Sequence, residues 1–163
     1  MESFDIKIDK DGVWYYKGAH MFRKEILHIF YEHLHMDECG RYLIELGQER
    51  SYLDVEDTVF VVSVVYKTQN PLNGREQIEI VLNDDSCEIL EMNTLSEGPD
   101  NVLYCRVKEG KFVARFSRKS YYQLAEFIEA SDSGDCFFIN LNGDKYFIAD
   151  VQTAEAPSAD SGK

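Results

Sequence analysis

The chain has 163 residues, of which 44% are hydrophobic and 13% aromatic, and its formal net charge is −13. This length fits one domain, or two small lobes that share a core, and folding then needs neither a metal nor a disulfide. The negative charge repels phosphate backbones and anionic lipid, and no apolar run reaches the ~20 residues of a membrane span. We therefore expect a cytoplasmic protein that binds neither nucleic acid nor membrane.

The first part of the chain predicts a hairpin, a helix and two further strands. The alternation in "FDIKID", the turn "KDG" and the following "VWYY" are typical of a β-hairpin. Residues 23–35 predict an amphipathic helix that ends before Gly40. "RYLIEL" and "RSYLDV" predict short strands joined at Gly47.

The middle and the second part continue with strands around one more helix. The β-branched run "TVFVVSVVYKT" predicts a central strand, and the loop "QNPLNG" separates it from the strands "EQIEIVL" and "CEILEM". After the loop "NTLSEGPDN", a second hairpin, "VLYCRV" and "KFVARF", turns at "KEG". Ser117 predicts the cap of a helix from Arg118 to about Ala130. Two strands around "NGD" follow, and residues 152–163 predict a disordered tail.

A shift of 95 residues lays the second half over the first. It places Arg23 and Lys24 on Arg118 and Lys119, and "RYLIEL" on "CFFINL". We therefore predict an α+β fold with duplicated β-hairpin–helix–β-hairpin units around a mainly antiparallel β core. The predicted parts are a first repeat unit (1–57), an intervening β element (58–100) and a second repeat unit (101–151). Chance is the alternative, because strand–helix–strand order is common.

Several stretches together resemble a bacterial family, in order and in spacing. They are "DGVWYYKG", "FRKEILHIF", "GRYLIEL", "YLDVEDTVFVVSV", "IEIVLNDD" and "FSRKSYYQL". The chain resembles domain of unknown function 1285 over residues 4–150. The resemblance implies an α+β fold of repeated strand-and-helix motifs and a role in signalling or ligand binding, and it supplies no catalytic residues. Where the family often has Asp-Ala-Pro-Phe, this chain has Asp57-Thr58-Val59-Phe60, which puts a turn before the central strand in doubt.

The pattern of chemically reactive residues favours no enzyme class. His28, Glu32 and His35, extended by Cys39, could follow one line of a helix as zinc ligands do. A solvated polar face is the preferred interpretation, so we predict no metal and no cofactor. The four cysteines contain no C-x-x-C pair and read as reduced thiols, and there is no G-x-S-x-G. We predict no catalytic residues.

Two pairs of cations raise a question, because each lies in the first turn of a predicted helix, where the macrodipole is already positive. Arg23 with Lys24, and Arg118 with Lys119, are the candidate ligand-binding residues, as anion sites at helix amino ends. The preferred interpretation is structural, with a carboxylate of the same half compensating each arginine. The acids available are Glu49, Asp54, Glu56 and Asp57 for Arg23, and Asp144 and Asp150 for Arg118.

For function, the sequence favours a non-enzymatic ligand- or protein-binding module in bacterial signalling or regulation, whose partner the sequence does not identify. The alternatives are a small-molecule enzyme with an unrecognised active site and an anion- or phosphometabolite-binding protein. The predicted core consists of Trp14, Ile26, Phe30, Leu43, Phe60, Val62, Val64, Ile78, Ile80, Leu124, Ile128, Phe138 and Phe147.

Overall fold

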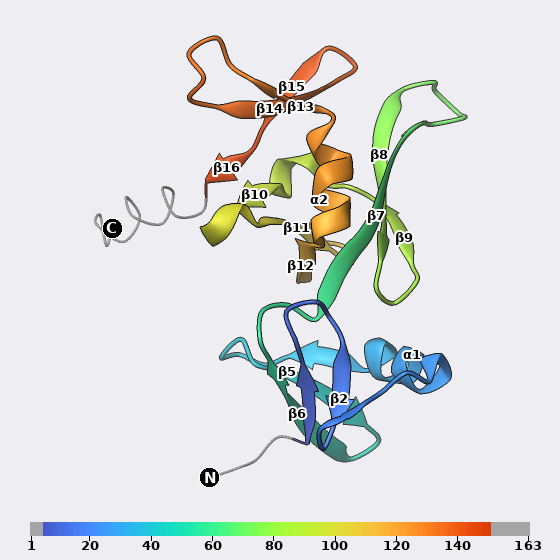
Figure 1. The fold of residues 1–163 in the computed structure, drawn as a ribbon. Coiled ribbons are helices and arrows are strands. Elements are labelled where there is room, and N and C mark those ends of the chain that lie inside the picture. The colour runs from blue at the N-terminus through green and yellow to red at the C-terminus, as the bar shows by residue number, and fades with distance from the viewer. Residues whose placement is uncertain (1–4, 151–163) are drawn as a thin grey trace. The chain divides into compact units, whose positions relative to one another are not determined.

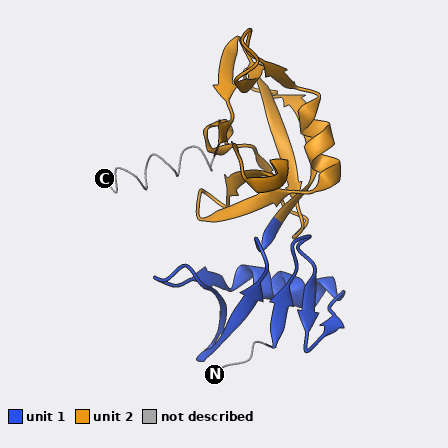
Figure 2. Cartoon of the chain, turned by 60° about the vertical axis from the view of Figure 1, so that its left-hand side comes forward, with its two compact units in different colours: residues 1–60 blue, residues 61–163 orange. Residues whose placement is uncertain are grey.

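The computed structural model describes residues 5–150, and most of the ordered elements are strands (Figure 1). The chain divides into two compact units, residues 1–60 and residues 61–163 (Figure 2). Each unit has its own sheet and its own helix, and each is described below by itself. The α+β class predicted from the sequence is confirmed at this level. The predicted tail, residues 152–163, lies outside the described residues.

Unit 1 consists of a six-stranded sheet and one helix. Its elements are β1 (Ile6–Ile8), β2 (Trp14–Tyr16), β3 (Ala19–His20), α1 (Lys24–Glu32), β4 (Leu34–Met36), β5 (Tyr42–Leu46) and β6 (Glu49–Val55). The strand order is β3-β2-β1-β6-β5-β4. All neighbours are antiparallel except β1 and β6, which run parallel. Because β3 and β4 are the two edge strands, α1 connects opposite edges of this sheet.

The core of unit 1 forms around Trp14, which is 1% exposed. Its ring lies 5.8 Å from the ring of Phe30 and 5.1 Å from that of Tyr31, and its indole N–H donates a 3.0 Å hydrogen bond to the Tyr31 hydroxyl. The Tyr31 ring in turn stacks on Phe60 at 5.5 Å. These contacts fix α1 by the side that carries Phe30 and Tyr31. The prediction that Ile26 is buried is wrong, because its side chain is 38% exposed.

Unit 2 has a seven-stranded sheet, a three-stranded sheet and the second helix. Its elements are β7 (Phe60–Gln69, which begins at the last residue of unit 1), β8 (Glu76–Leu82), β9 (Cys87–Ile89), β10 (Ser96–Glu97), β11 (Leu103–Val107), β12 (Phe112–Phe116), α2 (Arg118–Ala125), β13 (Ile128–Ala130), β14 (Phe137–Leu141), β15 (Asp144–Phe147) and β16 (Ala149–Asp150), with short 3₁₀ turns at Met92–Thr94 and Pro99–Asn101. The strand orders are β16-β10-β11-β12-β7-β8-β9 and β13-β14-β15. The buried residues Ile78, Ile80 and Leu124 belong to the core, as predicted.

Helix α2 begins as the sequence predicts and ends earlier. The Ser117 hydroxyl accepts a hydrogen bond from the Ser120 N–H at 3.1 Å, which confirms the predicted cap. The buried Ser120 hydroxyl donates to the Val62 carbonyl at 2.8 Å, so the first turn is tied to β7. The predicted extension to Ala130 is wrong, because the chain leaves the helix after Ala125 and forms β13, which pairs with β14.

The two halves share an element order after their helices and differ before them. In the first half β5 and β6 pair Leu46 with Glu49, and in the second half β14 and β15 pair Leu141 with Asp144, positions that are 95 residues later. Before the helices, the hairpin of unit 1 pairs with β6, whereas the β11–β12 hairpin of unit 2 lies inside the larger sheet.

Two further details bear on the predictions. The turn before β7 forms without the proline, because the buried Thr58 hydroxyl donates a 2.8 Å hydrogen bond to the Phe60 carbonyl. Among the predicted core residues, Phe147 is exposed, while Phe30, Val64 and Ile128 are only half-buried. Phe147 pairs with the buried Phe138 across the small sheet, with their rings 5.4 Å apart, but its own side chain is 55% exposed.

Candidate functional site

The positive charge of Arg23 is compensated by an acid two residues further along the chain. Its guanidinium lies 3.4 Å from the Glu25 carboxylate, and both side chains are exposed. Arg23 is the N-cap of α1 and makes no side-chain cap. Hydrogen bonds and charge lower the pKa of the Glu25 carboxyl. The largest contribution is the hydrogen bond from its own backbone N–H, followed by the hydrogen bond and then the charge of Arg23. A carboxylate in the first turn therefore offsets the cations there. The expected hydrogen bond from Arg23 to a carboxylate of its own half is present, but the partner is Glu25 and not one of the strand acids Glu49, Asp54, Glu56 and Asp57.

Arg118 is compensated differently. Its guanidinium lies over the Tyr122 ring at 5.9 Å, and no carboxylate within residues 5–150 pairs with it. The expected partners Asp144 and Asp150 are therefore wrong. Lys24 and Lys119 are both exposed. The four candidate residues lie in pairs on separate units, and the contacts of the two arginines are with Glu25 for Arg23 and with Tyr122 for Arg118.

The possible metal line is broken by the early end of α1. His28 and Glu32 belong to the helix, whereas His35 lies in β4 and Cys39 in the turn that follows. The His35 imidazole lies 3.5 Å from the Glu45 carboxylate instead. Across residues 5–150, no group of three or more metal-ligating side chains comes together.

A compact polar cluster joins two turns of unit 2. The Lys108 ammonium donates to the Asp84 carboxylate at 2.7 Å and to the Ser86 hydroxyl at 3.0 Å, and the Ser86 hydroxyl donates to Asp84 at 2.5 Å. The backbone N–H of Lys108 also meets the Glu88 carboxylate. Burial would raise the pKa of Asp84, but the hydrogen bonds from Lys108 and Ser86 and the charge of Lys108 outweigh burial and lower it. The cluster thus clamps the β8–β9 turn to the β11–β12 turn.

This clamp contains a serine, a lysine and a nearby cysteine, yet its geometry is poor for nucleophilic chemistry. An activated serine needs a base strong enough to take its proton. The Ser86 hydroxyl donates to Asp84, but the lowered pKa of that carboxyl makes it a weak base, and Lys108 donates a hydrogen bond to both groups. Burial, and to a lesser degree Glu88, raises the pKa of the Cys105 thiol to about 12. The thiol therefore stays protonated near neutral pH, and a thiolate nucleophile is not formed.

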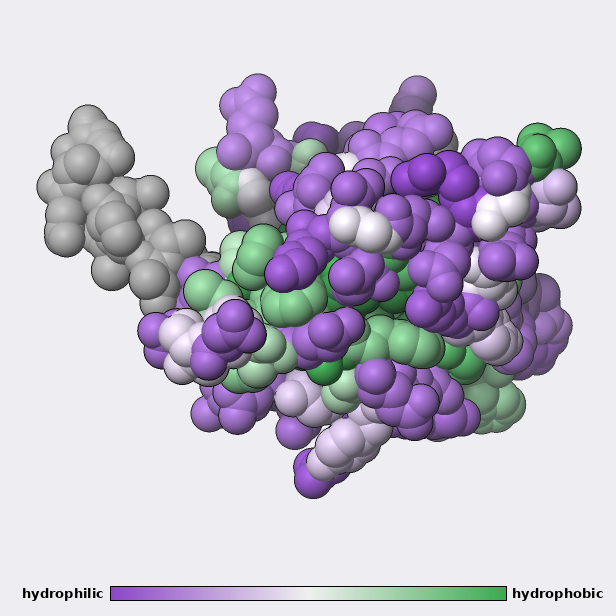
Figure 3. Space-filling model, turned by 90° about the horizontal axis from the view of Figure 1, so that it is seen from above, coloured by the Kyte–Doolittle hydropathy of each residue, from purple (hydrophilic) through white to green (hydrophobic). Residues whose placement is uncertain are grey.

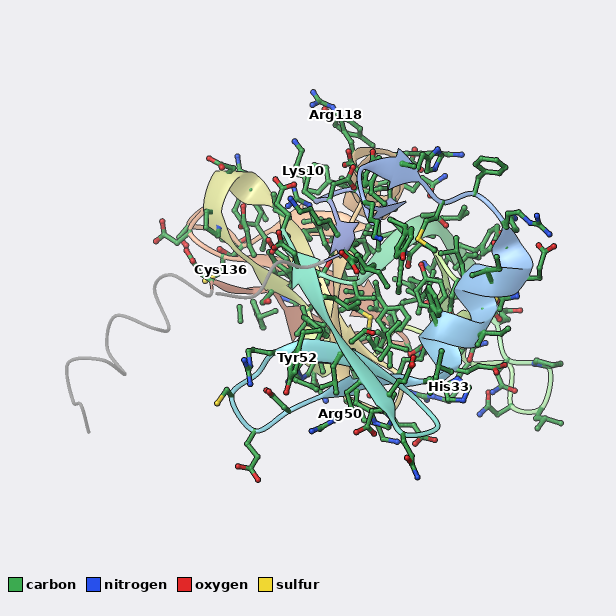
Figure 4. All side chains as sticks on the ribbon, turned by 90° about the horizontal axis from the view of Figure 1, so that it is seen from below. Lys10, His33, Arg50, Tyr52, Arg118 and Cys136 are labelled. Atoms are coloured by element: carbon green, nitrogen blue, oxygen red, sulfur yellow. The ribbon has the colours of Figure 1, made fainter. Side chains whose placement is uncertain are left out.

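The outer face of unit 1's sheet carries charges that pair with one another. The Asp37 carboxylate accepts hydrogen bonds from Arg41 at 2.9 Å and from the Tyr52 hydroxyl at 3.3 Å, and the Arg41 guanidinium lies 4.4 Å from the centre of the Tyr52 ring. Arg50, which projects from β6 near Tyr52 (Figure 4), pairs with Glu45 at 2.8 Å. Because the arginines are already engaged with acids, this face offers little free positive charge to a ligand.

Helix α1 leaves an apolar strip uncovered. Phe22, immediately before the helix, is 73% exposed, and Ile26 and Ile29 within it are 38% and 46% exposed. No residue of α1 is fully buried, because only the side with Phe30 and Tyr31 meets the core. We call Phe22, Ile26 and Ile29 the α1 strip. It consists of large aliphatic and aromatic side chains on a rigid element, which is the composition of protein-binding surfaces.

A histidine stands at each end of the α1 strip. The His20 ring lies 6.0 Å from the Phe22 ring. His33, at the C-terminal end of the helix (Figure 4), has its Nδ1 2.8 Å from the Ile29 carbonyl oxygen. Since a carbonyl only accepts hydrogen bonds, this Nδ1 carries the proton. All four histidines of the chain occur between His20 and His35.

The exposed apolar residues of unit 2 are more scattered. They are Tyr66, Leu72, Ile89, Tyr122, Phe137 and Phe147, and they lie on the β7–β8 hairpin, β9, α2 and the small sheet. Figure 3 shows a face that is mostly hydrophilic, with apolar residues between charged ones. Single exposed hydrophobic residues of this kind are normal on protein surfaces. The α1 strip is therefore the better candidate site.

Comparisons with known proteins identify the fold. A DUF1285 family protein from Silicibacter pomeroyi DSS-3 matches with a TM-score of 0.71 and 23% identity, covering 94% of this chain and 84% of that chain. A DUF1285 family protein from Shewanella baltica OS155 matches with a TM-score of 0.62 and 16% identity, covering 77% and 94%. No family model matches the sequence, and the search of curated proteins finds no match. The chain has a DUF1285-like fold, as the sequence motifs indicated.

Sequence reasoning selected the same segment for a different reason. It selected Arg23 and Lys24 because of their charge, whereas the feature that stands out in the structure is the exposure of Ile26 and Ile29 beside them. An amphipathic pattern indicates that a helix has an apolar face, but not how much of that face a sheet covers. In the part of the chain that the structure describes, no helix combines the length and the apolar character of a membrane span.

Proposed function

We propose that this protein is a non-enzymatic, protein-binding module of the cytoplasm, with a regulatory or signalling role, and that the α1 strip is its docking surface. The observation that carries the proposal is the exposure of Phe22, Ile26 and Ile29 along one rigid helix. Partner helices bind such surfaces by burying apolar side chains that are spaced along one face of the helix.

The energy available at the α1 strip supplies part of what a regulated contact needs. Fully burying an Ile or Phe side chain contributes about 1.5–3 kcal/mol, so covering the exposed parts of three contributes roughly 2–4 kcal/mol. Association also costs translational and rotational freedom, so the strip would be the centre of a larger contact and not the whole of it. An interface of moderate affinity suits a signalling protein, whose partners must also be released.

The enzyme alternative has less support among the described residues. The tightest polar cluster, around Lys108 and Asp84, holds its own hydroxyl and ammonium groups in mutual hydrogen bonds. The anion-site alternative has exposed cations, but Arg23 is paired with Glu25 and Arg118 lies over Tyr122. A surface for protein contact remains the interpretation with the most support.

A differential capture experiment tests the proposal. The tagged wild-type protein and the double variant I26E/I29E are used to capture proteins from a lysate of the native host, with quantitative mass spectrometry. We expect at least one protein to be retained by the wild type and reduced tenfold or more by I26E/I29E. Hydrogen exchange of the reconstituted complex should then show protection of residues 22–33.

The matched control replaces exposed apolar residues elsewhere, in Y66S/I89S of unit 2. This variant should capture the same protein as the wild type does. If I26E/I29E retains every partner while its circular dichroism spectrum is unchanged, the α1 strip is not the docking surface. Equal loss in both variants would show a general effect of surface polarity and would also contradict the proposal.

We further propose that the two halves are copies of one unit. The proposal rests on the 95-residue offset that relates the Leu46–Glu49 pair to the Leu141–Asp144 pair. An experimental structure tests it, because residues 34–55 should superpose on residues 129–150. Failure of that superposition would leave the common element order as chance.

A further inference from the structure

We propose that the α1 strip binds an acidic amphipathic segment of a partner protein, and that protonation of His20 and His33 strengthens the contact. This inference rests on the proposed docking function and specifies the partner's chemistry and its regulation. It is carried by the position of two histidines at the two ends of an exposed apolar strip.

The charge around the strip differs from that of the whole chain. The chain has a net charge of −13, whereas residues 20–35 combine Arg23 and Lys24 with all four histidines and contain two acids. Of those acids, Glu25 is paired with Arg23, and Glu32 is the other. When the histidines are protonated, this segment becomes the cationic part of an acidic protein. A partner that presents apolar residues flanked by carboxylates matches it, and a basic partner does not.

The orientation of His33 leaves one nitrogen for a partner. Its Nδ1–H is used by the Ile29 carbonyl at 2.8 Å, so Nε2 is the remaining site. In the neutral ring Nε2 only accepts a hydrogen bond, whereas in the protonated ring it donates one. A carboxylate of the partner is thus a poor neighbour of the neutral ring and forms a hydrogen-bonded ion pair with the protonated ring.

The charged groups that face these two rings do not remove the effect. His20 faces Tyr15 of β2 at 5.8 Å, and burial followed by Asp9 raises the pKa of that phenol, so Tyr15 stays neutral below pH 8. Asp9 itself accepts from the Tyr15 hydroxyl, and Asp11, which also acts on Tyr15, lies two residues further on.

Around His33 the nearby acid of β5 is already engaged. The Glu45 N–H donates to the His33 carbonyl, while the Glu45 carboxylate is held by Arg50 and by His35. Glu32, the chain neighbour of His33, is exposed, and Arg50 is the cation of this group. The internal carboxylate nearest to the ring therefore has other partners, and a partner protein's carboxylate can fill this role for His33.

Other occupants of the strip fit less well. An anionic membrane and a second copy of the chain would each bring an extended negative surface against a protein of charge −13, whereas a short acidic segment meets only the α1 strip and the cations beside it. Both remain as measurable outcomes. The proposed partner is a helical protein segment with aliphatic residues on one face and glutamates flanking that face.

The test uses a defined probe, a fluorescein-labelled 14-residue helical peptide with leucines on one face flanked by glutamates. Its affinity for the full-length chain is measured by fluorescence anisotropy at pH 7.5 and pH 5.8, where ordinary glutamates stay ionised. We expect about a tenfold tightening from two added charge pairs. The variant H20Q/H33Q should change affinity less than twofold between the two pH values, and H28Q/H35Q should keep the full response.

The outcomes separate the inference from the function it rests on. If I26E/I29E abolishes peptide binding but H20Q/H33Q keeps the pH response, docking stands and the regulation is wrong. If a peptide with glutamine at every glutamate position binds with the same pH dependence, the acidic-partner assignment is wrong. Binding to phosphatidylglycerol vesicles in place of the peptide, or dimerisation of the protein alone at pH 5.8, would overturn the proposal. If I26E/I29E binds the peptide as the wild type does, both proposals fall.

Discussion

Replacing Lys108 by methionine should destabilise unit 2 by leaving Asp84 without its cation. The Asp84 side chain is 9% exposed and the Lys108 side chain 29% exposed, and the two atoms of the pair lie 2.7 Å apart. A hydrogen bond to a charged group contributes about 1.5–3 kcal/mol net, and the orphaned carboxylate is only half compensated by Ser86. We therefore expect the free energy of unfolding to fall by about 2 kcal/mol in K108M. Methionine keeps most of the aliphatic stem, so lost packing contributes little.

The pH dependence of this loss has a definite sign. In the wild type the pKa of Asp84 is lowered, so its contribution to stability is present above the unfolded value near ~3.9 and is lost as the pH falls through the folded value. In K108M the lysine no longer offsets the effect of burial on Asp84, so the ionised carboxylate carries an uncompensated desolvation cost. The difference between K108M and the wild type should accordingly be largest at pH 7 and should shrink towards pH 4.

Urea denaturation followed by circular dichroism measures both effects, with K111M as the control. Lys111 lies in the same turn region and is exposed, so K111M should change stability by less than 0.5 kcal/mol, as surface substitutions generally do (about ±0.5 kcal/mol). The double variant K108M/D84N should recover part of the loss, because the amide carries no charge. If K108M and K111M unfold at the same urea concentration, the pair contributes nothing measurable and the reasoning is refuted.

Two further substitutions test contacts in unit 2 by the same assay. Ser117→Ala removes the cap of α2, which accepts from the Ser120 N–H, and should cost about 1 kcal/mol, whereas an unchanged midpoint would show that the cap is dispensable. Asn142→Gly keeps the positive φ of the β14–β15 turn but removes two side-chain hydrogen bonds to the Glu76 backbone, at 2.8 Å and 2.9 Å, and should cost about 1–2 kcal/mol. The exposed Asn140 provides the control, and a loss of equal size in N140A would contradict the assignment.

The strands were predictable where one face is buried and the other is not. Residues 76–82 alternate in the sequence, and the structure buries Ile78, Ile80 and Leu82. The start of α2 was predictable because Ser117 supplies its own signal. The short strand β10 was not, because two residues inside a loop carry no period.

The ends of both helices were the main error, for one physical reason. "LHM" and "IEA" continue an apolar pattern that a helix could follow, and neither helix is stopped by a glycine or proline at that point. Strand pairing determines where each helix ends, since β4 pairs with β5 and β13 pairs with β14. Tertiary pairing of this kind overrides local propensity, and it also separates His35 from the helix line to which His28 belongs.

The cations at the start of α1 lie on a helix that is held mainly by packing. Helix α1 has no side-chain cap, no basic residue in its last turn and no fully buried residue. Its own sequence stabilises it weakly, and the packing of Phe30 and Tyr31 on Trp14 holds it in place. Positions that break local rules without a gain in stability are commonly functional sites, which is the physical reason for proposing the exposed apolar residues of the α1 strip as a docking surface.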